Sequence, residues 1–260
     1  MRIDRLSRAA WLGLWRALRA WHRYEVHGLA NLERGRAALL VGYHGRPLAF
    51  DMCMLTTVIH ERLGYLPHGI IHGYFGAHPA LRACIDGLGF VTGDGPELAR
   101  AVARGEHILV QPGGTREGCR SFRDRYRVDW GDRTGYLRLA LRHRLAIVPV
   151  AASGVDDAFI GLNDGYALGR LLGAPHRLPL WLGLGLGVWP LALPLPVKIS
   201  QVIGAPIAFE ALRDPATDLP VDGRDRAALL RLHRKIGRTV QRLLDQANDR
   251  GATAVEAHAA

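Results

Sequence analysis

The chain has 260 residues with 34 Lys and Arg against 24 Asp and Glu, so its formal charge is 34 − 24 = +10. Its 48% hydrophobic and 22% charged residues exclude a disordered or collagen-like chain and favour a globular fold with anionic partners. Three widely spaced cysteines (Cys53, Cys84, Cys119) without a CxxC pair argue against a disulfide framework and favour a reducing cytosol.

Residues 1–23 predict an N-terminal amphipathic helix at a membrane interface. Apolar and basic side chains recur on opposite faces: Trp11, Leu14, Trp15, Leu18 and Trp21 on one, Arg8, Arg16, Arg19 and Arg23 largely on the other. A helix with a Trp face and an Arg face suits a lipid interface. The alternative is an ordinary helix that packs its Trp face on the protein core.

The rest of the chain alternates short apolar runs with helical stretches. The predicted strands are Ala37–Gly42, Tyr65–Ile71, Ile108–Gln111, Ile147–Ala151 and Val197–Ile203. The predicted helices are Phe50–Arg62, Ala80–Asp86, Pro96–Arg104, Gly135–Arg142 and Arg224–Asn248. This alternation predicts an α/β fold, a single layered domain over residues 24–250 with a central mixed sheet flanked by helices. Residues 251–260 are expected to form a flexible tail.

The segment after the first predicted strand carries a candidate catalytic pair. His44 follows the strand, and Pro47 suits the first turn of the next helix, which places Asp51 about one turn inside it. A carboxylate there could fix the imidazole tautomer and stabilise the imidazolium while the other ring nitrogen takes a proton from an alcohol. The alternative is a histidine that only closes the turn.

A second polar turn, Pro112-Gly113-Gly114-Thr115-Arg116-Glu117, follows the strand near residue 110. Adjacent glycines allow backbone amides to approach a ligand closely, and a guanidinium can hold a phosphate or a carbonyl through paired donors. The alternative is that Arg116 and Glu117 pair with each other and brace the loop.

The longest uncharged run is Leu178 to Val197, which is long enough to span a bilayer. However, it contains four prolines, each of which disrupts a helix by about 3 kcal/mol. We therefore expect an apolar loop that is buried or touches the membrane, and a protein that sits on a membrane rather than crossing it.

Four blocks in this order resemble the glycerolipid (lysophospholipid) acyltransferase superfamily, the PlsC-like proteins. They read Tyr43-His44-Gly45 to Asp51, Gly73-Tyr74-Phe75 to Gly89-Phe90, Gln111-Pro112-Gly113-Gly114-Thr115-Arg116-Glu117, and Ile147-Val148-Pro149-Val150. The blocks cover residues 38 to 155, and Gly204 to Ile207 is similar to the closing strand of the family.

This resemblance implies an α/β enzyme that transfers a fatty acyl group from acyl-CoA or acyl-carrier protein to the hydroxyl of a glycerolipid, lysophospholipid or other lipid alcohol. His44 would be the general base and Asp51 its partner. Gly113, Gly114, Thr115, Arg116 and Glu117 would contact the acceptor or the donor headgroup. The resemblance implies neither a metal nor a resident cofactor; the acyl thioester is a co-substrate.

Two departures from the family pattern bear on the acceptor. The usual histidine–aspartate spacing is H-x4-D, whereas His44 and Asp51 are spaced H-x6-D, and Gly113 stands where the family usually has Glu. A Pro-Gly-Gly loop and a His-Gly start look more like the branches that acylate neutral alcohols, such as diacylglycerol acyltransferases. Arg82 is the nearest candidate for the arginine that binds a phosphate acceptor in other members.

The expected partners are an acyl thioester, a lipid alcohol and an anionic membrane surface, with the protein peripheral or monotopic on the cytoplasmic face. The alternative function is a membrane-associated protein that binds lipid or acyl-CoA without catalysis. Nucleic-acid binding is suggested only by the charge of +10, because the chain has no known reader motif and no basic stripe interleaved with aromatics.

Overall fold

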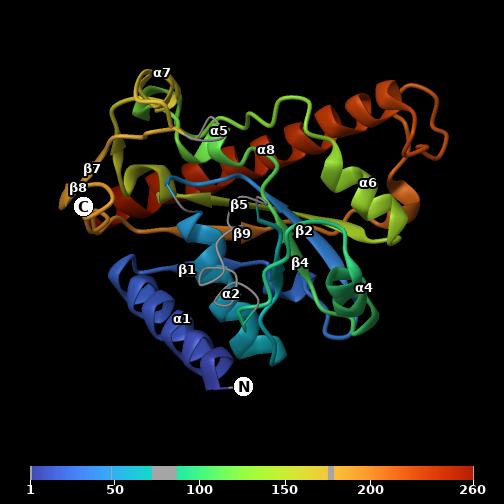
Figure 1. Ribbon diagram of the computed structural model, residues 1–260, viewed down its shortest axis with the longest axis horizontal. Coiled ribbons are helices and arrows are strands. Elements are labelled where there is room, and N and C mark those ends of the chain that lie inside the picture. Colours follow the sequence, from blue (N-terminus) through green and yellow to red (C-terminus); the bar gives the residue numbers. More distant parts are fainter. Residues whose placement is uncertain (1, 48, 72–86, 175–178, 260) are drawn as a thin grey trace.

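The computed structural model describes residues 2–47, 49–71, 87–174 and 179–259. A central six-stranded sheet has the order β1-β9-β5-β2-β4-β3 (Figure 1). Its strands are β1 (Glu25–His27), β2 (Ala38–Gly42), β3 (His68–Gly69), β4 (Ile108–Val110), β5 (Ala146–Ser153) and β9 (Ser200–Ile203). All neighbours are parallel except β5 and β9, so the sheet is mixed, as the sequence predicts.

Helices cover both faces of this sheet. The helices α2 (Phe50–Leu63) and α4 (Pro96–Ala103) follow strand ends, and α6 (Gly135–Arg142) and α8 (Arg226–Ala259) come later in the chain. Side chains alternate along β2: Leu40 joins the cluster packed on α2, whereas Leu39 and Val41 join the cluster that includes Leu137 of α6 and Leu229 of α8. A strand buried on both faces needs apolar residues at every position, which explains its uninterrupted apolar run.

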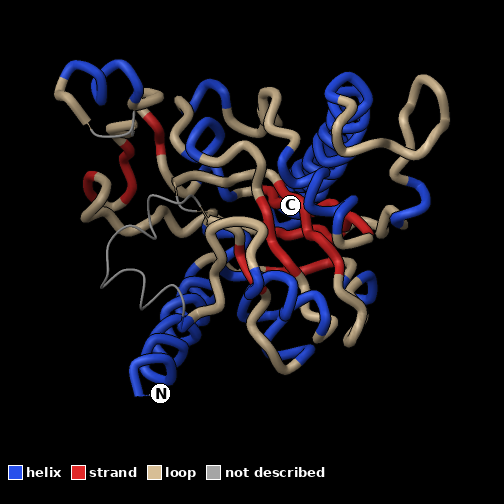
Figure 2. Tube along the Cα trace, turned by 45° about the vertical axis from the view of Figure 1, so that its right-hand side comes forward, coloured by secondary structure: helices blue, strands red, loops and turns tan. Residues whose placement is uncertain are grey.

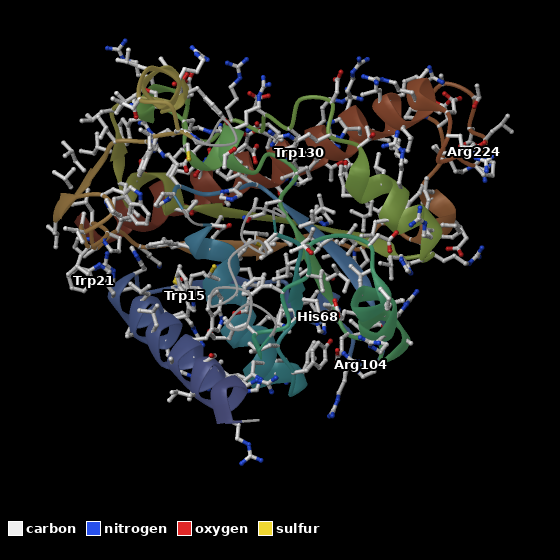
Figure 3. All side chains as sticks on the ribbon, in the orientation of Figure 1. Trp15, Trp21, His68, Arg104, Trp130 and Arg224 are labelled. Atoms are coloured by element: carbon white, nitrogen blue, oxygen red, sulfur yellow. The ribbon has the colours of Figure 1, made fainter. Side chains whose placement is uncertain are left out.

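In the N-terminal helix α1 (Arg2–Trp21), Trp11 and Trp15 pack on the protein, whereas Leu14 and Trp21, predicted for the same face, are 56% and 39% exposed. Trp15 is only 5% exposed and meets Phe50 of α2 edge to face, with 5.3 Å between ring centroids. Trp11 contacts Trp15 and Phe90 and donates its indole N–H to Thr56. Tryptophans that fill the core cannot also enter a membrane. Figure 3 shows Trp15 pointing toward α2 and Trp21 at the far end of α1.

A smaller antiparallel sheet, β6 (Ile160–Gly161), β7 (Gly183–Gly185) and β8 (Gly187–Val188), stands apart from the central one (Figure 2). The short helix α7 (Tyr166–Leu171) lies between β6 and β7 in sequence. Most of the long uncharged run lies here, as strands and loops rather than as a helix. Among the described residues, no helix combines the length and hydropathy that crossing a membrane requires.

Several predicted elements have different bounds. The run Tyr65–Ile71 contributes only two strand residues, continued by a bridge from Ile70 to Val91. The last strand begins at Ser200 rather than Val197. Helix α8 starts at Arg226 and includes residues 251–259, which the sequence analysis assigned to a flexible tail. The predicted helix Ala80–Asp86 and the block Gly73-Tyr74-Phe75 lie outside the described residues.

Candidate active site

The first and third motifs meet at one edge of the central sheet. Strands β2 and β4 are parallel neighbours, so their carboxyl ends lie together, where open α/β sheets commonly bind ligands. Gln111, just after β4, donates its side-chain amide N–H to the carbonyl oxygen of Tyr43, just after β2, at 2.8 Å. The short helix α5 (Thr115–Gly118) then brings the Gly-rich loop back toward His44.

The half-buried His44 has its imidazole oriented by backbone. Its Nδ1 lies 3.0 Å from the carbonyl oxygen of Gly45, which can only accept a hydrogen bond, so Nδ1 carries the proton and Nε2 keeps its lone pair. The ring lies against Gly118, where a Cβ atom would be 2.6 Å from Cε1 of His44. Burial lowers the pKa of His44 to about 4, so the ring is neutral at physiological pH.

Asp51 lies in the first turn of α2, as predicted, but it does not form the expected hydrogen bond with His44. No side chain among the described residues hydrogen-bonds to its carboxylate, although Asp51 is only 1% exposed. Burial raises its pKa to about 7, against the lowering effect of the Met52 amide. The Gly45 carbonyl occupies the His44 nitrogen that the carboxylate was expected to bind. Asp51 stays nearby, since a Cβ at Gly45 would lie 3.0 Å from its Oδ1.

Glu117 holds the Gly-rich loop against His44 from within the protein. It is fully buried, and its Oε2 accepts the His44 backbone N–H at 3.0 Å while its Oε1 accepts the Asp129 N–H at 2.7 Å. Nη2 of Arg120 lies 3.4 Å from Oε1. Burial raises the pKa of Glu117 to about 7, against the lowering effect of Arg120. Glu117 was expected to contact a substrate headgroup, whereas its oxygens are engaged by protein groups.

The glycines of the loop make room for this arrangement. A Cβ at Gly113 would lie 2.0 Å from Oε2 of Glu117, so any larger residue there would overlap the buried carboxylate. Gly114 has φ +49°, a left-handed conformation that favours glycine. The missing side chain at Gly113 therefore leaves the space that the Glu117 carboxylate fills. This packing accounts for a glycine at the position where the pattern usually has Glu.

Arg116 is exposed and forms an ion pair with Asp129, with 2.7 Å between Nε and Oδ2. The alternative that Arg116 pairs with Glu117 is therefore wrong, because the partner of Arg116 is Asp129. The Thr115 hydroxyl lies 3.1 Å from the Tyr166 hydroxyl on α7. Arg82 falls outside the described residues.

A buried polar network that the sequence did not predict lies beneath the site. Asp156, fully buried, accepts hydrogen bonds from the Tyr43 hydroxyl and from the Tyr126 N–H, the latter at 2.9 Å. Arg46, also fully buried, donates to the main-chain carbonyls of Asp156 and Arg120. The available signal for this network was that Tyr43 and Arg46, which are polar, closely follow an apolar strand. The hydrogen-bonded partners in the network are 30 to 113 positions apart, which local spacing cannot reveal.

This arrangement provides a half-buried imidazole with a fixed tautomer and an unprotonated Nε2, held where two Gly-rich turns converge. Such a group can accept a proton from a hydroxyl. Among the described residues, no cluster of three or more His, Cys, Asp or Glu side chains could hold a metal ion.

The chain matches several known proteins, although no family model matches it. It is 30% identical over 230 residues to a chicken protein named "DGAT1/2-independent enzyme synthesizing storage lipids", with 87% of this chain and 64% of that protein covered. The cattle protein of the same name is 27% identical, with 87% and 65% covered. An uncharacterized protein of Mycobacterium tuberculosis is 29% identical, with 78% and 57% covered. The chain thus spans less than two thirds of the length of these relatives.

Among solved structures, the chain is similar to the 1-acyl-sn-glycerophosphate acyltransferase PlsC of Thermotoga maritima. The TM-score is 0.51 at 14% sequence identity, with 94% of this chain and 78% of that one covered. At this identity the likeness concerns the fold. The predicted α/β fold is confirmed at that level, because the chain shares the fold of this acyltransferase structure.

Proposed function

We propose that this protein is an O-acyltransferase that moves a fatty acyl group from acyl-CoA or acyl-carrier protein to the hydroxyl of a lipid alcohol, with His44 as general base. The observation that carries the proposal is the His44 imidazole, whose Nδ1 proton is held by the Gly45 carbonyl while Nε2 remains free to accept a proton. The shared fold and the storage-lipid names of the relatives support the same reaction class.

In the proposed reaction, Nε2 of His44 takes the hydroxyl proton as the acceptor oxygen attacks the thioester carbonyl. The resulting tetrahedral oxyanion collapses, the carbon–sulfur bond breaks, and the thiolate leaves and receives the proton from the imidazolium. The products are an ester and a free thiol, so atoms and charges balance without a metal, a resident cofactor or an acyl-enzyme. Asp51 would stabilise the imidazolium through space, because buried charges interact strongly across a low-dielectric region.

A neutral lipid alcohol such as diacylglycerol is the proposed acceptor class. The Arg116 guanidinium is paired with the Asp129 carboxylate, so it is not an unpaired cation that could bind a phosphate. The relatives' names refer to storage lipids, which agrees with a neutral acceptor. Gly113, Gly114 and Thr115 would line the approach to His44. Arg82 remains the proposed contact for a phosphate-bearing acceptor.

The test is thiol release from acyl-CoA across a panel of lysophosphatidate, lysophospholipids, mono- and diacylglycerol, and long-chain alcohols. We expect His44→Ala to lower the rate with the preferred acceptor about 10²–10⁴-fold, as loss of a general base does. The matched control is His27→Ala, an exposed histidine on β1, which should keep the wild-type rate. A folded His44→Ala variant with full activity would rule out the mechanism.

The missing His44–Asp51 hydrogen bond favours one alternative, a membrane-associated protein that binds lipid or acyl-CoA without catalysis. Such a protein would show saturable acyl-CoA binding but no thiol release with any alcohol of the panel. The same assay therefore separates the two functions.

A further inference from the structure

Exposed apolar side chains gather in one part of the described structure. Of the fifteen large hydrophobic residues that are exposed there, eleven lie between residues 160 and 193. They are Ile160, Leu162, Leu171, Leu172, Leu180, Leu182, Leu184, Leu186, Val188, Leu191 and Leu193. Leu191 is 95% exposed. Exposed apolar surface concentrated in one part of a soluble protein commonly marks a surface that binds a partner or a membrane. We call these eleven residues the apolar face.

The alternation of Gly and Leu explains why the leucines point outward. Gly183 and Gly185 face the aromatic rings beneath, since a Cβ at Gly183 would lie 2.2 Å from the Trp181 ring and one at Gly185 would lie 3.0 Å from Phe159. Alternate residues of a strand point to opposite sides, so Leu184 and Leu186 face outward. Trp181, Trp189 and Phe159 pack edge to face below them and support the face from inside.

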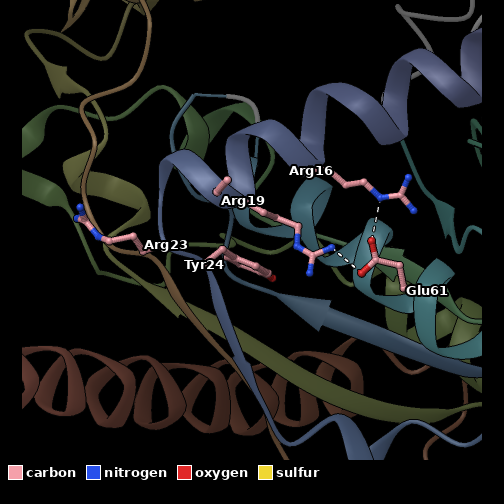
Figure 4. A pocket seen from close by; sticks show the side chains of 6 residues that line it. Arg16, Arg19, Arg23, Tyr24 and Glu61 are labelled. Atoms are coloured by element: carbon pink, nitrogen blue, oxygen red, sulfur yellow. Dashed lines mark hydrogen bonds and ion pairs between the residues drawn. The ribbon is translucent and has the colours of Figure 1, made fainter.

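Basic groups border the apolar face at the end of α1. Trp21 donates its indole N–H to the Pro194 carbonyl at 3.0 Å, and Arg23 donates to the Pro196 carbonyl at 2.8 Å. Arg23 also lines a surface pocket of about 480 Å³ with Arg16, Arg19, Ala20, Tyr24 and Glu61 (Figure 4). Glu61 pairs with Arg16 and Arg19, whereas the Arg23 guanidinium points away toward Pro196. The pocket is thus lined by three arginines and one carboxylate, which leaves a positive balance.

We infer that the apolar face and this arginine pocket together form the surface by which the protein docks on an anionic lipid bilayer. The leucines would enter the acyl region, and the pocket would take a phosphate-bearing headgroup. Charge complementarity selects this occupant, because arginines beside an apolar surface match the negative potential of anionic lipids. A second copy of the chain fits less well, since an isologous interface would bring two basic rims together.

The docking surface adjoins the candidate active site. Trp181 donates its indole N–H to the Arg120 carbonyl at 3.1 Å, and the Tyr166 hydroxyl contacts Thr115 of the Gly-rich loop. A lipid leaving the bilayer at this face would therefore start next to the loop that approaches His44. The inference rests on the proposed function only for this link; the docking itself is independent of catalysis.

The test measures flotation of the full chain with two kinds of vesicle. One kind contains phosphatidylcholine alone, and the other also contains about 30 mol% phosphatidylglycerol to represent the anionic lipids of a cytoplasmic leaflet. The variant Leu186→Glu/Leu191→Glu/Leu193→Glu should partition at least about tenfold less onto the anionic vesicles. The matched control is Leu219→Glu, which changes a leucine of similar exposure outside the apolar face and should bind like the wild type.

A second pair of variants tests the arginine pocket. Arg16→Gln/Arg23→Gln should lose most of the preference for anionic over zwitterionic vesicles. Arg224→Gln/Arg226→Gln removes the same charge at the start of α8, far from Trp21 in Figure 3, and should keep that preference. Equal loss in both pairs would mean a general charge effect and would contradict a headgroup site.

Three results would overturn the inference. In the first, the wild type floats no more than the background. In the second, the triple leucine variant floats like the wild type. In the third, the wild type is a dimer and the triple leucine variant is a monomer. Circular dichroism, together with thiol release from a water-soluble short-chain thioester, checks that the variants fold. If the wild type floats as expected but releases no thiol, the docking surface stands and the proposed function fails.

Discussion

The side chain of Glu117 fills the space where a side chain at Gly113 would lie. A Cβ at position 113 would lie 2.0 Å from Oε2, 2.1 Å from Cδ and 2.2 Å from Cγ of the Glu117 side chain, and that side chain holds the His44 backbone. At this scale, the site depends on a pair of residues that fit each other rather than on either residue alone. The same buried carboxylate lies in the low-dielectric interior, which makes it sensitive to pH.

The fit predicts coupling between the two positions. Gly113→Ala should lower the free energy of unfolding by about 1–3 kcal/mol, because an added methyl overpacks a filled site. In a Glu117→Ala background the same substitution should cost much less, since the overlapping side chain is gone. Urea unfolding of the four proteins measures the coupling. The control Gly13→Ala, at an exposed helical position with no neighbour within 4 Å, should be neutral or slightly stabilising.

Glu117 also predicts a pH dependence of stability. Its pKa is raised from 4.5 to about 7 in the folded protein, so the folded state holds this proton more tightly than the unfolded chain. The contribution of Glu117 to the free energy of unfolding therefore falls as pH rises from 4.5 to 7. Relative to wild type, Glu117→Gln should gain stability over this window, by up to about 1.4 kcal/mol per pKa unit. Urea titrations at several pH values measure it, and a constant difference would contradict the burial argument.

At the scale of elements, helix α1 joins the two parts of the structure. Its tryptophans begin a chain of ring contacts that runs through Phe50 of α2 to Phe159, next to the small sheet. Its last turn is hydrogen-bonded to the segment 194–197. Arg16 and Arg19 meanwhile pair with Glu61 of α2. The helix thus serves as core on one face and as a basic surface on the other.

Two adjacent residues of α1 distinguish core packing from membrane contact. Trp15→Ala should lower the free energy of unfolding by about 3–5 kcal/mol, because it removes a buried ring and leaves a cavity. The matched control Leu14→Ala changes a side chain that is 56% exposed and should cost little. Chemical denaturation without lipid gives both values. If both substitutions lowered the free energy of unfolding by similarly small amounts, core packing of Trp15 would be contradicted and the lipid-interface alternative would be favoured.

At the scale of the whole molecule, charge and apolar surface are unevenly distributed. The chain carries a net charge of +10, yet residues 179–197 contain no charged side chain. Most of the exposed leucines of the described structure lie in and around this run, whereas arginines lie on α1 beside it. On the proposed docking surface, this distribution would attract the protein to an anionic bilayer, and burial of the leucines would hold it there.

This distribution predicts a salt dependence that differs between substrates. Turnover of a lipid acceptor in anionic vesicles should fall as salt rises from about 0.05 to 0.5 M, because the Debye length shrinks. Turnover of a water-soluble acceptor should change little, since no bilayer encounter is needed. Initial rates of thiol release at matched substrate concentrations provide the comparison. Equal salt sensitivity for both substrates would place the effect at the active site instead.

Local patterns determined the elements and the positions of the motifs. The strand Ala38–Gly42, the helix starting at Phe50 and the loop at Pro112 follow from apolar periodicity and from turns rich in Gly and Pro, which depend on near neighbours alone. The order of the motifs also predicted the fold that the chain shares with the PlsC structure. These properties need no knowledge of which distant residues meet.

Only the tertiary structure decided which groups those residues contact. The proton on His44 is held by a backbone carbonyl rather than by Asp51, Glu117 is enclosed by protein donors, and the Tyr43 hydroxyl binds Asp156, 113 positions away. Trp15 of α1 is buried in the core, whereas Trp21 and the leucines of the small sheet are exposed. Whether an apolar or ionisable side chain is buried depends on what packs against it, and packing joins segments that are far apart in the chain.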